Sequence, residues 1–516
     1  MVATGHPLAS SAGLAVLRAG GNAVDAAVAA GLVSAVVLPE MCGLGGDLFA
    51  VLHDPTGTHS VQGSGIAPRS LTIDQLRAAG SARSRGPLSV TVPGMVDAYF
   101  TLLARFGTRS FADLVEPAIE YAEGHPITPE RIVYIDRFAS LLREYPSSAA
   151  VFLPDGRVPL PGEVLRQPDL ASTLRLLASG GRDEFYRGEL AERIGAFMAS
   201  IGGALSADDL VTQATEVTAP ISTTYRGHTV YETCLPSQGQ IVLEALNILE
   251  SFDLSLGSAE AVHLQVEAVK LAFADRHAYA KDPAFGPSPV DELLSKDWAA
   301  RRAAAIGLKA SDDLPPGEFD RGDTSYLCVI DGNGTMVSLI QSVAANFGSG
   351  IVAGDTGVVL NNRASAFSLD DNHPNVFAPG KKTVHTLNAY LVADPSGTPV
   401  LVGGTPGGDR QPQWNVQFLT GLIDGGWDVQ QTLEQPTWIS SVGSGSGRTA
   451  NEFTLDLEAR FGPSVASALE ERGHRVTVGP DFTPESSVAQ LIARDPTSGV
   501  LAGGTDPRSE GAVLAF

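Results

Sequence analysis

One threonine in this chain has the sequence context of an N-terminal nucleophile. Thr324 follows Asp323 where a loop containing Pro315 and Pro316 enters an apolar run. If the bond between Asp323 and Thr324 is cut, Thr324 gains an α-amine that can take the proton of its own hydroxyl. The reference pKa of an α-amine is about 7.7–8.0, so part of it is neutral at cellular pH without a separate histidine. Because Asp-Thr before a strand is more often an ordinary strand entry, the surrounding sequence has to decide.

The residues after Thr324 predict a hairpin that would hold the nucleophile. Two apolar runs, 325–330 and 336–342, flank Asp331-Gly332-Asn333-Gly334, a turn of the Asp-Gly and Asn-Gly type. Neither run alternates cleanly between polar and apolar residues, which indicates a sheet covered on both faces by other layers.

A set of short motifs runs in order along nearly the whole chain. The motifs are Gly20-Gly21-Asn22-Ala23-Val24-Asp25-Ala26-Ala27, Val92-Pro93-Gly94, Pro236-Ser237-Gln238-Gly239, Phe273-Ala274-Asp275-Arg276, Asp323-Thr324-Ser325-Tyr326, 346–354, 357–362, Thr405-Pro406-Gly407-Gly408 and Thr505-Asp506-Pro507-Arg508. Each glycine-rich string alone is typical of a turn or helix cap, but the ordered set is specific. It resembles signatures of the gamma-glutamyltransferase family of self-cleaving N-terminal-nucleophile hydrolases.

The resemblance implies an α/β fold, the four-layer αββα sandwich of N-terminal-nucleophile hydrolases. It also implies a large subunit, 1–323, and a small subunit, 324–516, in one interleaved unit, with 312–323 as the segment that is cut. Residues 147–162 are expected to form a loop. Periodicity predicts helices at 11–18, 23–37, 95–105, 111–123, 190–200, 241–251, 259–280 and 463–472, and strands at 48–53, 228–232, 388–393, 400–403 and 488–493.

Catalytic roles follow from the same resemblance. The Thr324 hydroxyl would attack the carbonyl of Asp323 during maturation and a substrate amide during turnover. The backbone N–H groups of Gly407 and Gly408 match the family's oxyanion hole, although a plain tight turn is the alternative. Ser342 stands where the family has a hydroxyl that hydrogen-bonds the nucleophile, although a buried strand serine bonded to its own sheet would look the same.

The substrate positions depart from those of glutathione-specific members. Those enzymes hold the glutamyl carboxylate with an arginine and a serine pair, and the ammonium with an aspartate. This chain has Ser64, His385-Thr386 and Ala366 at those places. Losing the aspartate removes the anion that would pair a desolvated ammonium, which costs several kcal/mol in a buried pocket.

Arg363 offers a compensating cation. Together with His385 it could clamp a carboxylate without requiring an amino group. The ordinary alternatives are a surface or subunit-contact arginine and a core histidine. We therefore expect an acyl group bearing a carboxylate, glutaryl- or oxalyl-like, to be preferred over its gamma-glutamyl counterpart.

The neighbouring motifs resemble the amidase and acylase branch of the family, which includes oxamate amidohydrolases and acylases that remove glutaryl groups from cephalosporins. They are Asn-Arg-x-Ser-x-Phe-Ser from Asn362, His-Thr-Leu-Asn from His385 to Asn388, and Gly45-Gly46-Asp47. Asn362, Thr386 and Asn388 are accordingly expected in the substrate site.

Three other functions stay open at this point. The chain could be a true gamma-glutamyltransferase or glutathione hydrolase that binds the ammonium with other groups. It could cleave a C–C bond in an antibiotic pathway and release oxalate; arginine dominates its 35 basic residues, which is typical of GC-rich bacterial genomes where such pathways occur. It could also be an inactive homologue that only binds, although the intact Thr324, Gly407 and Gly408 favour an enzyme.

The composition of the chain excludes several classes of binding partner. A chain of 516 residues with 43% hydrophobic and 18% charged residues is typical of a soluble globular protein, and a net charge of −23 argues against nucleic acid and anionic lipid. Cys42, Cys234 and Cys328 lack metal-site spacing, and no metal or cofactor is expected. The expected partners are a small amide substrate and the two cleavage products, as a heterodimer or a dimer of heterodimers.

The expected location is the cytoplasm. No apolar run is long enough to span a bilayer, and Met1 is followed directly by family-like sequence without a signal peptide. Many family members are exported, so an exported form stays open if a signal segment has been removed.

Overall fold

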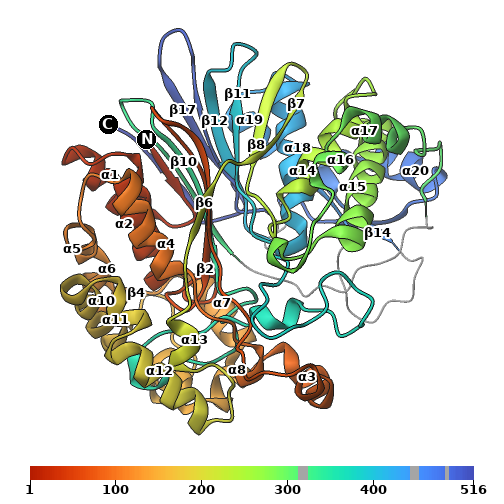
Figure 1. The fold of residues 1–516 in the computed structure, drawn as a ribbon. Helices are drawn as coiled ribbons and strands as arrows, with labels where there is room; N and C mark the ends of the chain where they lie inside the picture. Colours follow the sequence, from red (N-terminus) through yellow and green to blue (C-terminus); the bar gives the residue numbers. More distant parts are fainter. Residues whose placement is uncertain (312–323, 442–452, 483–486) are drawn as a thin grey trace.

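Two stacked β-sheets, each covered by helices on its outer face, form the centre of the protein (Figure 1). The structure is a computed structural model that describes residues 1–311, 324–441, 453–482 and 487–516. Thr324 is therefore described, whereas Asp323 and the predicted cleavage segment 312–323 lie outside the described residues.

The first sheet carries the predicted hairpin. Its strand order is β18-β1-β9-β10-β2-β3-β6, and neighbouring strands are antiparallel. The strands are β18 (Ala512–Leu514), β1 (Val2–Thr4), β9 (Ser325–Ile330), β10 (Met336–Ser342), β2 (Asp47–Asp54), β3 (Gly57–Gly63) and β6 (Glu216–Thr218). The sheet thus interleaves the predicted large and small subunits, because β9 and β10 lie between β1 and β2.

The second sheet has the order β17-β16-β12-β11-β8-β7 and is likewise antiparallel. Its strands are β17 (Leu501–Thr505), β16 (Gln490–Arg494), β12 (Pro399–Gly404), β11 (Tyr390–Ala393), β8 (His228–Glu232) and β7 (Ile221–Tyr225). A hydrophobic core that includes Phe49, Tyr326, Leu391 and Ile492 joins the two sheets.

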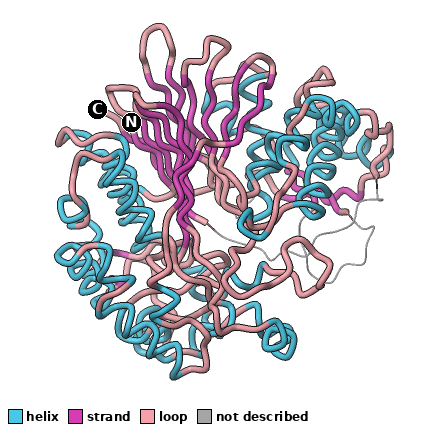
Figure 2. The backbone as a smooth tube through the Cα atoms, in the orientation of Figure 1, coloured by secondary structure: helices cyan, strands magenta, loops and turns pink. Residues whose placement is uncertain are grey.

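Helices complete the four layers, as Figure 2 shows. The first sheet is covered by α1 (Pro7–Arg18), α2 (Ala23–Val37) and α4 (Met95–Phe106), and the second by α14 (Gly239–Leu249), α15 (Ala259–Tyr279) and α18 (Gln411–Ile423). The predicted αββα sandwich is confirmed. No helix in the described part of the chain is long and apolar enough to cross a membrane.

The remaining elements surround this sandwich. A helical lobe lies below the first sheet in Figure 1. The remaining helices are α3 (Ile73–Ala79), α5 (Phe111–Leu114), α6 (Glu116–Glu123), α7 (Pro129–Arg137), α8 (Ala139–Glu144), α9 (Pro146–Phe152), α10 (Pro168–Gly180), α11 (Arg182–Tyr186), α12 (Glu189–Ser200), α13 (Ala207–Leu210), α16 (Val290–Leu293), α17 (Lys296–Ala303), α19 (Val429–Glu434) and α20 (Pro463–Glu471). Two small sheets add β13 (Trp438–Ser440), β14 (Thr454–Glu458) and β15 (Arg475–Gly479), and β4 (His125–Pro126) and β5 (Val164–Leu165).

Two local predictions were wrong. The loop predicted at 147–162 begins inside α9, where Pro146 occupies the first turn and the buried Phe152 packs into the core. The single helix predicted at 111–123 is two helices, α5 and α6, with Pro117 in the first turn of α6. In both places the proline begins a new helix, because its missing N–H is not needed in a first turn.

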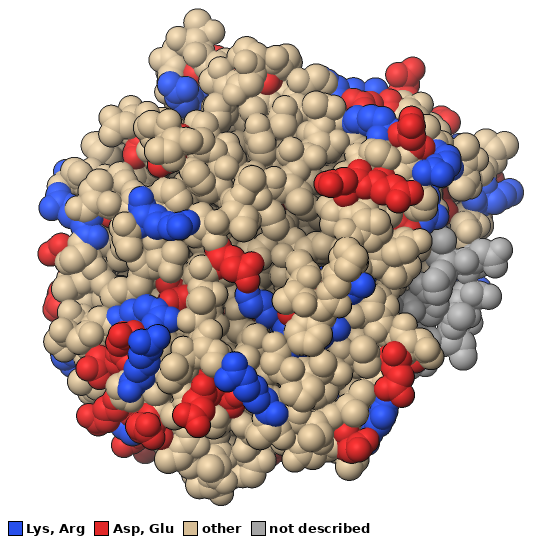
Figure 3. Space-filling view, viewed as in Figure 1, with Lys and Arg blue, Asp and Glu red and all other residues tan. Residues whose placement is uncertain are grey.

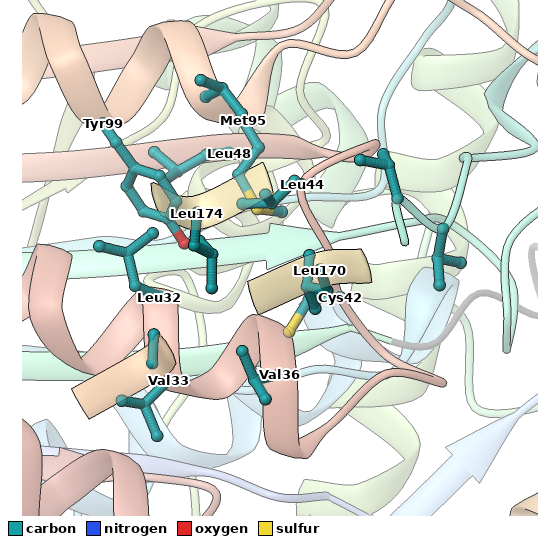
Figure 4. Close-up of a cluster of buried hydrophobic side chains, with 14 of the residues drawn as sticks. Leu32, Val33, Val36, Cys42, Leu44, Leu48, Met95, Tyr99, Leu170 and Leu174 are labelled. Atoms are coloured by element: carbon teal, nitrogen blue, oxygen red, sulfur yellow. The ribbon is translucent and has the colours of Figure 1, made fainter. Parts of the chain in front are cut away.

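The first family motif caps and packs the central helix. Asn22 accepts a hydrogen bond from the Asp25 N–H, and the Asp25 carboxylate accepts one from the Asn22 N–H, which makes a capping box at the start of α2. All residues of α2 are buried. Figure 4 shows side chains of this helix against Leu48 of β2 and Tyr99 of α4. The face of β2 that carries Leu48 therefore packs on helices, and the opposite face looks toward the second sheet.

Candidate active site

Strand register brings Thr324 into a row of polar residues. In β9 and β10, Ser325 pairs with Gln341, so Thr324 is the next residue opposite Ser342. Ser342 also pairs with Asp47 of β2. Leu48 pairs with Gly63 of β3, which places Ser64 next to Asp47. These four residues therefore lie in one row across four neighbouring strands, at the same end of the sheet.

The polar row faces the space between the two sheets. Residues two apart along a strand share a face, and both Tyr326 and Phe49 pack in the core between the sheets. Thr324, Ser342, Asp47 and Ser64 are all fully buried. A small cavity beside Thr324 is lined by residues that include Leu38, Met41, Arg131 and Pro406.

Ser342 supports the turn that follows its strand. Its Oγ accepts a hydrogen bond of 2.8 Å from the backbone N–H of Ala344. Ala344 has a φ of 84°, a left-handed conformation that costs a residue other than glycine about 1–3 kcal/mol. The serine thus stabilises a strained turn while standing opposite Thr324, and both roles considered from the sequence are compatible with its position.

The Gly407-Gly408 turn connects β12 to α18 through a short 3-10 helix, Gly408–Arg410. The φ values are 131° and 59°, and a Cβ on Gly407 would lie 2.4 Å from the ring of Trp414, so glycine is required there. In the part of the chain that the structure describes, neither glycine N–H donates to a backbone carbonyl. Neither donor is thus used by the backbone, which leaves both to side-chain or ligand acceptors.

Gln411 connects this turn to Thr324. Its side-chain amide lies 3.5 Å from the Thr324 hydroxyl oxygen. In the amide orientation that satisfies more hydrogen bonds, the oxygen takes that place and accepts from the Gly408 N–H at 3.2 Å. A polar oxygen already held by Gly408 next to Thr324 occupies the kind of position that an oxyanion needs. Sequence reasoning missed Gln411, because no motif includes it.

Gln238 joins the Gly407-Gly408 turn to the segment from His385 to Asn388. Its Nε2 donates to the carbonyl of Thr386 at 2.6 Å and to that of Gly408 at 2.8 Å, and the side chain is fully buried. The preceding Ser237 donates to the Leu387 carbonyl at 2.6 Å. The motif around Gln238 thus positions two parts of the site, a role that the sequence did not reveal.

Replacing Gln238 with methionine should lower kcat about 10- to 100-fold, because both backbone segments lose a shared anchor and a misplacement of about 1 Å can cost 100-fold. The measurement is kcat on the best amide substrate, together with thermal unfolding to confirm the fold. Gln75→Met, on the exposed helix α3, is the matched control. A folded Gln238→Met enzyme with kcat within about twofold of the parent would remove Gln238 from the site.

Arg363, His385 and Asp47 meet at the other end of the polar row. Arg363 Nε lies 3.3 Å from Asp47 Oδ2, and His385 Nε2 lies 3.6 Å from the same oxygen. All three are buried, with at most 3% of each residue exposed. Arg363 is thus not a surface residue: it contacts Asp47 across the boundary between the two predicted subunits, and His385 is buried beside them. We call Asp47, Ser64, Arg363 and His385 the buried polar cluster.

Several atoms of the buried polar cluster have no hydrogen-bond partner among the described residues. They are Asp47 Oδ1, Ser64 Oγ, Arg363 Nη2 and both ring nitrogens of His385. Buried polar atoms are normally paired, and each unpaired one costs about 1–3 kcal/mol or more. So many in one place mark a position that a polar ligand would occupy.

Burial is the largest cause of the pKa shifts of the ionisable groups in the buried polar cluster. It raises the pKa of Asp47 to about 6, with Arg363 and, more weakly, the nearby Gly65 backbone acting in the opposite direction. Burial and then the Arg363 charge hold the pKa of His385 well below its usual value, so this ring is neutral. Burial also lowers the pKa of Arg363, which Asp47 opposes; a guanidinium nevertheless stays charged.

The position of Asp47 contradicts the expectation from the sequence that no carboxylate lies near Arg363. Ala366 indeed provides no carboxylate, but the pocket is not without an anion, because Asp47 reaches it from β2. The motif Gly45-Gly46-Asp47 indicated only a resemblance to the amidase and acylase branch. Nothing in the spacing of Asp47 and Arg363 along the chain indicates their contact.

The other predicted substrate residues lie around the cluster with different roles. Thr386 Oγ1 is 3.5 Å from Arg363 Nη1. Asn362 accepts from the Ala345 N–H and donates to the Ser84 carbonyl, so its amide holds loops together. Asn388 Oδ1 accepts a hydrogen bond of 2.8 Å from Asn415, and its amide nitrogen lies 3.0 Å from the Gln411 side-chain amide.

A possible metal-ligand set among the described residues is His263, Glu267 and His474. Its members already pair: His263 Nδ1 and His474 Nε2 are 2.8 Å apart, and the Lys270 ammonium lies 2.8 Å from Glu267. A buried ammonium beside the carboxylate disfavours a cation there.

Charged side chains are dispersed over the surface shown in Figure 3, where Lys and Arg lie among Asp and Glu. This face presents no continuous basic patch of the kind that nucleic acid requires.

Known proteins resemble this chain over its full length. The family model described as Gamma-glutamyltranspeptidase matches residues 9–516. A glutathione hydrolase-like YwrD proenzyme of Bacillus subtilis is 41% identical, and an oxamate amidohydrolase proenzyme of Klebsiella pneumoniae is 38% identical; each comparison covers 100% of this chain and 98% of the relative. The crystal structure of a cephalosporin acylase from Bacillus halodurans matches with a TM-score of 0.91 and 39% identity, covering 100% of this chain and 95% of that one.

Proposed function

Since the chain belongs to the gamma-glutamyltranspeptidase (gamma-glutamyltransferase) family, with relatives in its amidohydrolase and acylase branch, we propose that it is a self-processing N-terminal-threonine amidohydrolase. Thr324 is the nucleophile, and the acyl group of the substrate carries a carboxylate. The mature enzyme would be a heterodimer of residues 1–323 and 324–516, built from one precursor chain.

Maturation and turnover would use the same hydroxyl. In the precursor, the Thr324 hydroxyl adds to the carbonyl of Asp323, the peptide nitrogen leaves as the new α-amine, and water opens the resulting ester. In turnover, that amine takes the hydroxyl proton while the oxygen attacks the substrate amide. The Gly407 and Gly408 N–H groups stabilise the oxyanion, the departing amine takes the proton, and water releases the acid from the acyl-enzyme.

The observation that carries the proposal is the polar row between the sheets. The nucleophile stands at one end, and Arg363, paired with Asp47, is at the other. Asp47 is two strands away from Thr324, which corresponds to about 9–10 Å at the usual strand spacing. An acyl group that reacts with Thr324 would therefore extend along the row, with its far end at the unpaired Arg363 Nη2.

An acyl series tests the substrate class. We expect p-nitroanilides of glutaryl, succinyl or oxalyl groups to be hydrolysed. The two-strand separation favours the longer acyl chains. For a glutaryl amide, kcat/KM should exceed that of the 5-methylhexanoyl amide, which has the same shape without the charge, by about 100-fold or more, because the uncharged group leaves buried donors unpaired. Equal rates for the two would contradict the carboxylate site.

A second candidate function is hydrolysis of gamma-glutamyl amides such as glutathione. Asp47 favours it, because an anion beside Arg363 could pair the glutamyl ammonium, and the name of one relative is glutathione hydrolase-like. Release of glutamate from glutathione at a rate above that of glutaryl amides would support this candidate.

A further inference from the structure

The free oxygen of Asp47 is not explained by binding a carboxylate. Among the residues that the structure describes, Arg363 Nη2 is a donor without a partner and suits an anion, whereas Asp47 Oδ1 is an acceptor without a partner. A carboxylate placed on Arg363 would leave that acceptor without a partner and would add a second negative charge nearby. The cluster therefore presents both a cationic donor and an anionic acceptor to one end of the acyl group.

We infer that Asp47 is a specificity-determining residue that selects between acyl groups with and without a hydrogen-bond donor beside their carboxylate. An ammonium next to the carboxylate would donate to Asp47 Oδ1 while the carboxylate binds Arg363 Nη2. This inference rests on the proposed function, since it assumes that the acyl group extends from Thr324 along the polar row.

The protonation state of Asp47 sets the direction of the selection. The ionised carboxylate attracts an ammonium and repels a second carboxylate, and the protonated form does neither. With a pKa of about 6 in the empty site, Asp47 changes state near neutral pH. A bound ammonium lowers this pKa, and a bound carboxylate alone raises it, so each ligand stabilises the form that suits it.

The groups around Asp47 leave it as the residue that titrates in this range. Arg363 contacts it and stays charged, and the neutral His385 lies 3.6 Å away. Lys382 adds a weaker positive charge, and Tyr186, which senses the charge of Asp47, has a pKa held well above its usual value by burial. Burial and the Arg363 charge keep the His385 ring neutral, and the Arg363 guanidinium stays charged throughout this range.

The test is the ratio of kcat/KM for glutaryl p-nitroanilide to that for gamma-glutamyl p-nitroanilide, measured from about pH 5 to about pH 8 with the full enzyme. Titration of the Thr324 amine affects both substrates and cancels in the ratio. We expect the ratio to fall about tenfold or more as the pH rises, which is the size expected for a hydrogen bond between charged groups.

Variants separate selection from mere support of the fold. Asp47→Asn should make the ratio independent of pH and shift it toward the glutaryl substrate. Asp74→Asn, on the exposed helix α3, should match the parent. If Asp47 only positions Arg363, Asp47→Asn will slow both substrates equally with an unchanged ratio, which overturns the inference.

The remaining outcomes are also decisive. A pH-independent ratio in the parent overturns the inference, and this measurement does not depend on whether Asp47→Asn folds. A parent that hydrolyses neither amide contradicts the proposed function itself, whereas turnover with a flat ratio leaves that function intact and removes only the role of Asp47.

Discussion

Thr324→Ala should leave the chain as one uncut polypeptide with no amide hydrolysis. Both steps require the same hydroxyl, and enzymes that lose a covalent nucleophile commonly lose about 10⁴- to 10⁶-fold in kcat. A denaturing gel shows the processing directly, because the parent should give bands near two-thirds and one-third of the chain. The fold should persist, since the substitution removes only one hydroxyl and one methyl group from a buried side chain.

Two controls make the Thr324 result specific. Thr324→Ser keeps a hydroxyl and should retain part of both activities, and Thr335→Ala, which removes another buried hydroxyl from the same hairpin, should process normally. Mass spectrometry of the small subunit gives its first residue. An N-terminus at any residue other than Thr324 would refute the mechanism, and processing of Thr324→Ala would do so equally.

Arg363→Leu should lower kcat/KM for a carboxylate-bearing amide by about 100-fold or more, since removing one partner of a buried charge pair costs about 3–5 kcal/mol. Part of that cost falls on folding, because Asp47 is left unpaired. Self-cleavage should continue, as it needs no acyl carboxylate. Steady-state kinetics on glutaryl p-nitroanilide, with the gel as a check of processing, measures the two effects separately.

A double variant distinguishes the binding role of Arg363 from its role in stability. Asp47→Asn with Arg363→Leu removes both charges and should regain thermal stability relative to Arg363→Leu, while the glutaryl substrate stays poor. Arg363→Lys keeps the charge but loses the two-pronged geometry and should fall between parent and leucine variant. Retention of kcat/KM within about threefold in a folded, processed Arg363→Leu enzyme would rule out the carboxylate site.

Local chemistry made much of the site predictable from the sequence. Thr324 had to begin a strand, because the apolar run and the turn after it define the hairpin. Glycine at 407 was required by its backbone angle and by the ring of Trp414. In the same way, Asn22 and Asp25 form a cap over three residues. Each of these depends on neighbours along the chain, so periodicity and motif were enough.

Residues that act across the fold were not predictable. Gln238 bridges Thr386 and Gly408, and Gln411 lies beside Thr324, through hydrogen bonds between segments far apart in the sequence. An isolated glutamine gives no signal of its partners, because its amide pairs with any backbone group that packing brings near it. Helix α9 was also not predicted, because the prolines that follow it in the sequence are typical of a loop.

The sequence by itself determined the family through its ordered motifs, and the resemblance to that family implied the sandwich and the proposed nucleophile. Only the tertiary structure decided which charged groups meet in the buried polar cluster. Asp47 meets Arg363 because the register of β2 against β10 turns its side chain toward the second sheet. A shift of one residue would turn Asp47 toward the helices instead. Register is set by the packing of both sheets together. The sequence alone therefore could not indicate that the Asp47 carboxylate lies beside Arg363.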